Sequence, residues 1–209
     1  MDILDIADYL INVLIPIAIS IFAIMDPPAA IPTLISYIGV LSGSEKDVKK
    51  IVNRIVNKAI IVVFILLTIF SLAGEYILKF FNIDLASLRI AGGVLLMAVA
   101  IDMLITGHKP ENVSSGDFAV VPIATPLIVG PGTMSTLIVY SRIYGSLTTL
   151  LGAYIALSIS YPLLRYSYDL FKYLGTSTLQ GLGKFMSLII ASIAVSLIFS
   201  GLRDLGLTK

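Results

Sequence analysis

Apolar residues dominate the chain in long stretches that short polar connectors separate. A helix that crosses a bilayer needs about 20 predominantly apolar residues. The pattern predicts six transmembrane segments, at residues 9–41, 51–73, 85–105, 118–141, 146–168 and 185–203. No connector is long enough to be a soluble domain, so residues 1–209 are expected to form a single transmembrane domain.

The first segment is too long for one straight helix. Residues 9–41 would extend about 50 Å, whereas the hydrocarbon core is about 30 Å thick. Asp26-Pro27-Pro28 interrupts this segment, and Gly130-Pro131-Gly132 interrupts the fourth. We therefore expect helices 1 and 4 to be broken at mid-membrane, where a break is tolerated only if it faces protein or a water-filled cavity. The sequence leaves open whether the broken segments cross the membrane or turn back as re-entrant hairpins.

The two halves of the chain are weakly similar. Laying residues 1–105 over residues 106–209 places Asp26-Pro27-Pro28 on Gly130-Pro131-Gly132. Three segments in each half reverse the direction of the second half. The predicted fold is an all-α polytopic membrane protein with six transmembrane helices in two inverted three-helix repeats, an architecture that occurs in secondary transporters.

Composition narrows the class of protein further. Of all residues, 57% are apolar and 13% are charged, against roughly a quarter charged in soluble domains. The net charge of +1 gives no indication of nucleic acid binding, and cysteine is absent. His108 is the single histidine and is expected in a loop, so no metal site or cofactor is predicted. Asp2, Asp5 and Asp8 stand where a signal peptide would carry basic residues, so no cleaved signal is expected.

The distribution of lysine and arginine predicts the orientation in the cell membrane. The side that holds the connectors after segments 1, 3 and 5 has nine basic residues: Lys46, Lys49, Lys50, Arg54, Lys58, Lys109, Arg165, Lys172 and Lys184. The opposite side has five: Lys79, Arg89, Arg142, Arg203 and Lys209. This difference predicts a multi-pass protein with both termini extracellular. The lipid bilayer is the expected partner, and the oligomeric state stays open.

Asp26 is the first candidate functional residue. A carboxylate deep in a membrane span costs about 3 kcal/mol or more and is by default a functional hypothesis. The alternative is that Asp26 only caps the half-helix that begins at Pro27. The two roles are compatible, since the same oxygens could cap a helix and contact a ligand ammonium.

The residues around both breaks form the candidate substrate site. Half-helices that begin there direct backbone N–H groups and positive dipole ends toward the membrane centre, where they suit a carboxylate. Small residues allow close approach of a ligand, and hydroxyls could donate further hydrogen bonds. The predicted substrate-binding residues are Asp26, Pro27, Pro28, Ala29, Ala30, Thr33, Gly130, Pro131, Gly132, Thr133, Ser135 and Thr136. Each hydroxyl could instead serve only interhelical packing.

The third segment holds three further candidates. Asp102 is either a cation or proton relay or an interfacial residue that pairs with a lysine. Gly92-Gly93 predict a close helix crossing. Arg89 is interpreted as a residue that extends to the membrane interface, in preference to a counter-charge for Asp102.

Four motifs together resemble the MarC family: residues 26–32, 88–96, 100–104 and 126–132. The resemblance covers essentially the whole chain. It implies six membrane helices in two inverted repeats and, from archaeal members, transport of small neutral amino acids such as glycine and alanine with a cation. The chain departs from the family where members often have Gly-Asn, because it has Ala29-Ala30. A ligand contact made by that asparagine cannot be transferred.

The residues and the resemblance lead to one expected function. We expect a secondary active transporter for glycine, alanine and serine that works by alternating access with Na⁺ or H⁺ coupling, and not an enzyme. One alternative is an exporter, permease or channel for another small solute or drug; a metal ion is a poor substrate because few oxygen ligands lie at depth. A remote alternative is an intramembrane aspartyl protease, but Asp26 and Asp102 are predicted at different depths.

Overall fold

A computed structural model describes residues 5, 8–28, 30–31, 34–35, 45–106 and 129–207. All secondary structure within these ranges is helical. The elements are the π-helical turn η1 (Leu10–Leu14), α2 (Ile15–Met25), α4 (Glu45–Phe80), α5 (Leu85–Thr106), α6 (Pro131–Tyr144), α7 (Ser146–Arg165) and α8 (Ser167–Asp204). Four helical stretches are long and apolar enough to cross a membrane: Val48–Phe80, Leu85–Ile105, Ser146–Arg165 and Ser177–Asp204.

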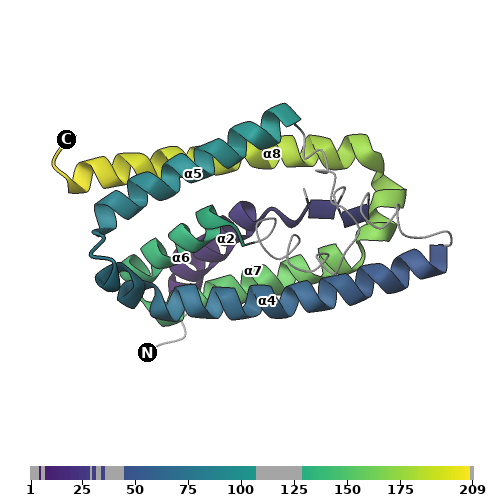
Figure 1. Cartoon of the computed structure of the whole chain (residues 1–209), viewed down its shortest axis with the longest axis horizontal. Coiled ribbons are helices and arrows are strands. Elements are labelled where there is room, and N and C mark those ends of the chain that lie inside the picture. Colours follow the sequence, from purple (N-terminus) through teal and green to yellow (C-terminus); the bar gives the residue numbers. More distant parts are fainter. Residues whose placement is uncertain are drawn as a thin grey trace.

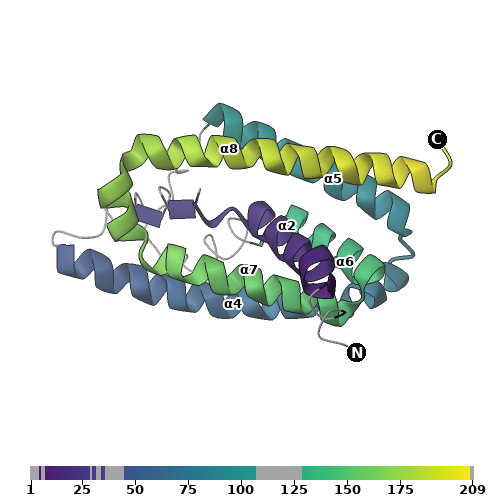
Figure 2. The ribbon, with the colours of Figure 1, turned by 180° about the vertical axis from the view of Figure 1, so that it is seen from behind.

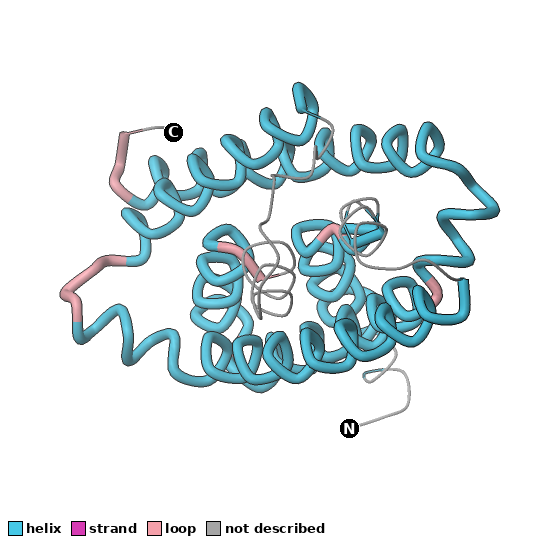
Figure 3. The backbone as a smooth tube through the Cα atoms, turned by 45° about the vertical axis from the view of Figure 1, so that its right-hand side comes forward, coloured by secondary structure: helices cyan, strands magenta, loops and turns pink. Residues whose placement is uncertain are grey.

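The long helices form two pairs with the short helices between them. α4 lies beside α7, and α5 lies beside α8 (Figure 1). The short helices α2 and α6 fill the space between the pairs, as the opposite view also shows (Figure 2). In Figure 3 the long helices run around the short ones, which lie inside the ring. α2 begins and α8 ends at the same end of the molecule (Figure 1).

Glycines allow the helices to approach one another closely. A Cβ built on Gly93 would lie 2.7 Å from the Ala194 carbonyl oxygen, and one on Gly201 would lie 2.7 Å from the Ala86 carbonyl oxygen, so α5 and α8 meet almost backbone to backbone. A Cβ on Gly152 would lie 2.6 Å from the Ile17 side chain, which presses α2 onto α7. Small residues at such contacts are typical of membrane helices, which associate by close packing and not by a difference in hydrophobicity.

Two buried apolar clusters hold these helices together. One includes Met25 with residues of α4, α6 and α7, and the other includes Ile24 with residues of α5, α6 and α8. Ile24 and Met25 are adjacent and belong to the last turn of α2. The point at which α2 ends is therefore packed from both sides of the molecule.

The second, third, fifth and sixth predicted spans agree with the structure in position and differ in length, whereas the first and fourth lie partly outside the described residues. α5 (Leu85–Thr106) and the start of α7 (Ser146) match their predictions closely, whereas α4 is longer at both ends. The polar connector between the fifth and sixth predicted spans is itself helical: α8 starts at Ser167 and is kinked at Gly175 (φ 74°, ψ 166°), and its apolar span begins at Ser177. Apolar content marks the part of a helix inside hydrocarbon, and polar helical turns continue beyond it.

Candidate functional site

Asp26 ends α2 and changes the direction of the chain. Its φ of 40° and ψ of 58° lie in the left-handed region, and its backbone N–H donates to the Phe22 carbonyl oxygen at 3.0 Å. This is the conformation of a helix C-cap, for which Asp is one of the few suitable non-glycine residues. The interpretation that Asp26 caps the helix beginning at Pro27 is corrected in part, because a residue that caps a helix start usually has extended dihedral angles. Helix resumes directly afterwards, at Pro27 and Pro28.

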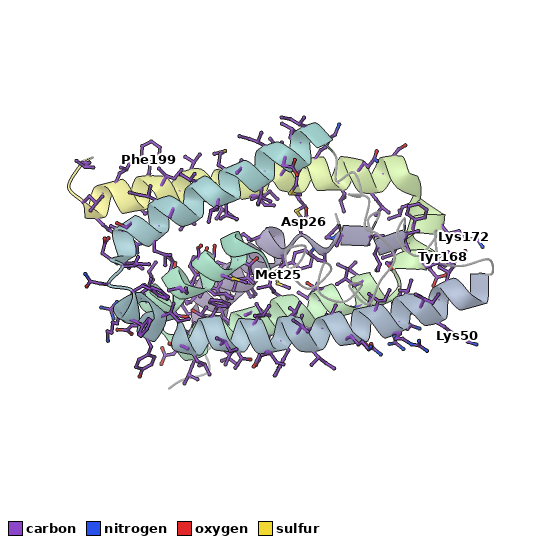
Figure 4. All side chains as sticks on the ribbon, viewed as in Figure 1. Met25, Asp26, Lys50, Tyr168, Lys172 and Phe199 are labelled. Atoms are coloured by element: carbon purple, nitrogen blue, oxygen red, sulfur yellow. The ribbon has the colours of Figure 1, made fainter. Side chains whose placement is uncertain are left out.

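The Asp26 side chain is buried in the middle of the molecule. Only 5% of the residue is exposed, and Figure 4 places it midway along the long axis, between the end that carries Lys50 and the end toward Phe199. The apolar helix Leu10–Met25 is about 24 Å long, less than a hydrocarbon core of about 30 Å. A helix of this length that starts at the membrane surface ends inside the membrane, and Asp26 follows its last residue.

The second break forms the start of α6. Gly130 is the N-cap in extended conformation (φ −87°, ψ −179°), and Pro131 is the first helical residue, where its missing N–H costs nothing. The Met134 N–H already bonds to the Gly130 carbonyl oxygen at 3.0 Å. The Gly132 N–H belongs to the first turn, whose amides point away from the carbonyls of their own helix. This end of α6 therefore carries amide donors and a positive dipole toward the break.

Three hydroxyl side chains follow within the first two turns of α6. Thr133 is 2% exposed and Thr136 is fully buried, and their spacing of three residues puts them on one face of the helix. The Thr136 Oγ1 atom has no hydrogen-bond partner among the described residues. Ser135 points elsewhere, because it packs against Gly92 of α5. The predicted hydroxyl cluster is thus divided between a face near the break and a helix contact.

The two breaks lie beside each other in the interior. A Cβ built on Gly132 would lie 2.4 Å from Leu96 of α5 and 4.0 Å from Ile24, in the last turn of α2. Further along, Tyr140 of α6 lies close to Ser20 of α2. Val129, Met25 and Ala30 share one buried cluster. The structure therefore brings together the two segments that the sequence marked as candidates.

The structure describes only some of the remaining candidates near the first break. Pro27, Pro28 and Ala30 are buried beside Asp26. Ala29 and Thr33 lie outside the described residues, as does His108.

Asp102 does not belong to this buried group. It is exposed on α5, while its neighbours Ala100 and Met103 face the interior. The relay role stays a prediction, and the interfacial alternative fits this exposed position. A proton-sharing pair with buried Asp26, which an aspartyl protease needs, finds no basis in these placements.

Arg89 has a partner that the sequence did not indicate. Its guanidinium forms an ion pair with Asp204 at the end of α8 and is only 13% exposed. The interpretation of Arg89 as a residue extending to the interface was therefore incomplete. No sequence signal could have paired these two residues, because 115 positions separate them.

The donor set suits a small zwitterion better than a metal ion. Among the described residues, no group of three His, Cys, Asp or Glu side chains could hold a metal. The break instead offers one buried carboxylate, amide N–H groups at a helix start and buried hydroxyls. A carboxylate suits a ligand ammonium, and a helix N-terminus suits a ligand carboxylate.

Long apolar spans around two short internal helices, with buried Asp26 and Thr136 at the centre, define a polytopic α-helical membrane protein. The comparison with protein families agrees: a model described as MarC family integral membrane protein matches residues 11–205. The chain belongs to the MarC family, which confirms the resemblance noted in the sequence motifs.

Relatives align along nearly their whole length. A UPF0056 membrane protein of Methanocaldococcus jannaschii is 32% identical over 197 residues, which cover 88% of this chain and 93% of that protein. UPF0056 membrane protein YvbG of Bacillus subtilis is 26% identical over 207 residues, covering 92% and 95%. UPF0056 membrane protein YhcE of Escherichia coli is 28% identical over 201 residues, covering 90% of each chain. No solved structure matches the chain.

Proposed function

We propose that this protein is a secondary active transporter for small neutral amino acids, with glycine, alanine and serine as substrates and Na⁺ or H⁺ as the coupling ion. One observation carries the proposal: α2 ends at buried Asp26 in the interior, and α6 starts nearby, after Gly130. Broken helices at the membrane midplane form the substrate sites of several transporter folds.

The chemistry of the two breaks matches the two charges of an amino acid. The amides and positive dipole at the start of α6 would hold the carboxylate. The Asp26 carboxylate would hold the ammonium, and the Thr133 and Thr136 hydroxyls would add hydrogen bonds.

The size of the substrate follows from the packing around α6. Leu96 already contacts Gly132 so closely that a Cβ there would collide with it at 2.4 Å. Ile24 also lies 4.0 Å from this Cβ position, and both side chains are buried. A site with these neighbours favours a ligand with a small side chain, as in glycine, alanine and serine.

The packing of the helices is consistent with an inverted repeat, which we include in the proposal. α2 packs on α7 as α6 packs on α4, and α6 packs on α5 as α2 packs on α8. In an inverted repeat α2 corresponds to α6, α4 to α7 and α5 to α8. This correspondence turns the α2–α7 contact into the α6–α4 contact, and the α6–α5 contact into the α2–α8 contact. Alternating access would then move one repeat, or the two broken helices, relative to the long helices.

The direct test is counterflow in proteoliposomes. Purified protein is reconstituted in vesicles loaded with unlabelled glycine, and uptake of labelled glycine is followed for wild type, Asp26→Asn and Asp102→Asn. We expect transient accumulation in wild type, competition by alanine, loss in Asp26→Asn and retention in Asp102→Asn, because counterflow needs the substrate site and not the ion gradient.

Two other results would change the assignment. Failure of wild-type protein to accumulate glycine, alanine or serine under any Na⁺ or H⁺ gradient would refute the amino acid transporter. Accumulation that persists in Asp26→Asn would keep the transporter and reduce Asp26 to a residue that ends α2. For Asp102→Asn, uptake driven by a gradient should fall while counterflow persists if Asp102 relays the coupling ion.

A further inference from the structure

Three basic residues of α4 form a stripe along one face of the helix. Lys50, Arg54 and Lys58 follow one another at intervals of four residues, and all three are exposed. Residues four apart lie above one another on a helix. The stripe is about 12 Å long from Lys50 to Lys58.

The basic stripe continues directly into the lipid-facing surface of α4. The next exposed residues on this side of the helix are apolar and reach 60% exposure at Ile61, 49% at Ile65 and 45% at Ile69. The opposite face, which includes Val56, Val63 and Leu67, is buried against other helices. The three cations therefore point toward the surrounding membrane.

Aromatic residues at the other end of α4 fix the level of the hydrocarbon core. Tyr76 is 73% exposed, Phe80 is 83% exposed and Phe81 is 64% exposed, as expected of residues at a membrane interface. Counting back about 20 residues, or about 30 Å, from Lys79 places the other interface next to Lys58. Arg54 and Lys50 then lie roughly 8 Å and 14 Å beyond it, at and above the level of lipid headgroups.

At the opposite end of the molecule, three basic residues form ion pairs. Lys79 and Arg142 pair with Glu75 at 3.0 Å and 2.6 Å, and Arg89 pairs with Asp204. None of Lys50, Arg54 and Lys58 forms an ion pair with a side chain that the structure describes. Nearby Lys49 does pair, with Asp169 of α8 at 2.6 Å, and its side chain lies over the Tyr168 ring.

The start of α8 marks the same membrane level. Tyr166 is 58% exposed and Tyr173 is 89% exposed on the turns before Gly175. Figure 4 shows Lys50, Tyr168 and Lys172 together at this end of the molecule. Exposed tyrosines beside exposed cations are typical of the headgroup region.

We propose that Lys50, Arg54 and Lys58 form a docking stripe for the headgroups of anionic phospholipids. The acyl chains of the bound lipids would lie along the apolar face that begins at Ile61. One lipid would then contact both the basic stripe and this apolar face. Charge complementarity favours this occupant, because lipid phosphates are the anions at the level of Lys58 and Arg54, and Lys50 is the next cation above them on the same face.

The test uses native mass spectrometry of the full-length protein in detergent. Phosphatidylglycerol and phosphatidylcholine with identical acyl chains are titrated separately into wild type and a Lys50→Gln, Arg54→Gln, Lys58→Gln variant. Wild type should bind phosphatidylglycerol in preference. Each cation contributes about fivefold, so the triple variant should lose on the order of one hundredfold in phosphatidylglycerol affinity with no change for phosphatidylcholine.

Two controls separate the stripe from general charge. A Lys50→Arg, Arg54→Lys, Lys58→Arg variant keeps all three charges and should keep the preference. Arg203→Gln removes a cation from the opposite end and should leave the preference unchanged. Wild-type protein alone gives a further measurement, since the preference should weaken as salt is raised.

The proposal is overturned if wild type binds both lipids equally, or if the triple glutamine variant keeps wild-type affinity for phosphatidylglycerol. If that variant does not fold, the salt titration of wild type decides. A preference independent of salt would then exclude the stripe as an electrostatic site.

Discussion

Ser135 of α6 packs against Gly92 of α5 so closely that a Cβ at position 92 would lie 2.7 Å from the Ser135 Cβ. The next residue, Gly93, makes an equally close contact with α8 on another side of the same helix. Two consecutive glycines thus allow α5 to pack closely against both α6 and α8. The close crossing that the sequence predicted at Gly92-Gly93 is confirmed, and it involves two helices instead of one.

A methyl group at position 93 should destabilise the α5–α8 pair. In Gly93→Ala the new Cβ would meet the Ala194 carbonyl oxygen at 2.7 Å, and backbone cannot move aside as a flexible side chain can. We expect a loss of about 1–3 kcal/mol, the usual cost of overpacking. Thermal unfolding in detergent, followed by size-exclusion chromatography, measures it. Gly181→Ala is the matched control on α8, because nothing lies within 4 Å of its Cβ; equal melting of both variants would contradict the close contact.

Substitutions of Asp26 should separate backbone conformation from charge. The left-handed φ of 40° is tolerated by Asp, Asn and Gly but costs about 1–2 kcal/mol with most other side chains. We therefore expect Asp26→Ala to melt below wild type and Asp26→Asn and Asp26→Gly to melt above Asp26→Ala. Glycine counterflow should be lost in all three variants, because each removes the carboxylate. Counterflow in Asp26→Gly would mean that the conformation and not the charge is required.

Thr136 should matter for transport more than for folding. Its Oγ1 atom is buried without a described partner, so replacing the hydroxyl with a methyl group in Thr136→Val should change stability by less than about 1 kcal/mol. Thr149→Val is the matched control, since Thr149 of α7 is also fully buried and its Oγ1 also lacks a described partner. Glycine counterflow should fall at least tenfold in Thr136→Val, the loss of about 1.4 kcal/mol of binding, and stay unchanged in Thr149→Val. An equal effect in both variants would remove Thr136 from the site.

The start of α5 should lose stability in acid. The Ser87 backbone N–H and hydroxyl both donate to the Asp84 carboxylate at 2.7 Å, and these bonds hold the pKa of Asp84 below its ordinary value. A lowered pKa in the folded state means that the stabilisation is present above about pH 4 and is lost as the pH falls through the folded value. Melting temperatures of wild type and Asp84→Asn, measured from about pH 6 to about pH 3, should converge at low pH. Curves that stay parallel would contradict the cap.

Patterns in the sequence located the end of α2 and the start of α6 well, because both reflect local chemistry. Proline removes a donor and left-handed turns need a residue such as Asp or Gly, so both positions could be located without a structure. Each of these features depends on residues a few positions apart.

Features that depend on distant residues could not be predicted. The Arg89–Asp204 ion pair, the contact of Ser135 with Gly92 and the approach of Ile24 to Gly132 all join separate helices. The packing between helices determines these partners, and this packing cannot be predicted from a single sequence. The longer helices α4 and α8 were underestimated for another reason, since polar turns outside the hydrocarbon have no apolar signal.

The Arg89–Asp204 ion pair also has a consequence for how the protein is made. The two residues are 115 positions apart, which corresponds to roughly 6–23 s of synthesis at typical elongation rates. During that interval α5 has left the ribosome with a guanidinium whose carboxylate partner has not yet been translated. A helix that is synthesised later, α8, therefore supplies the carboxylate that neutralises Arg89 of α5, and a chain truncated before Asp204 would leave this arginine without that partner.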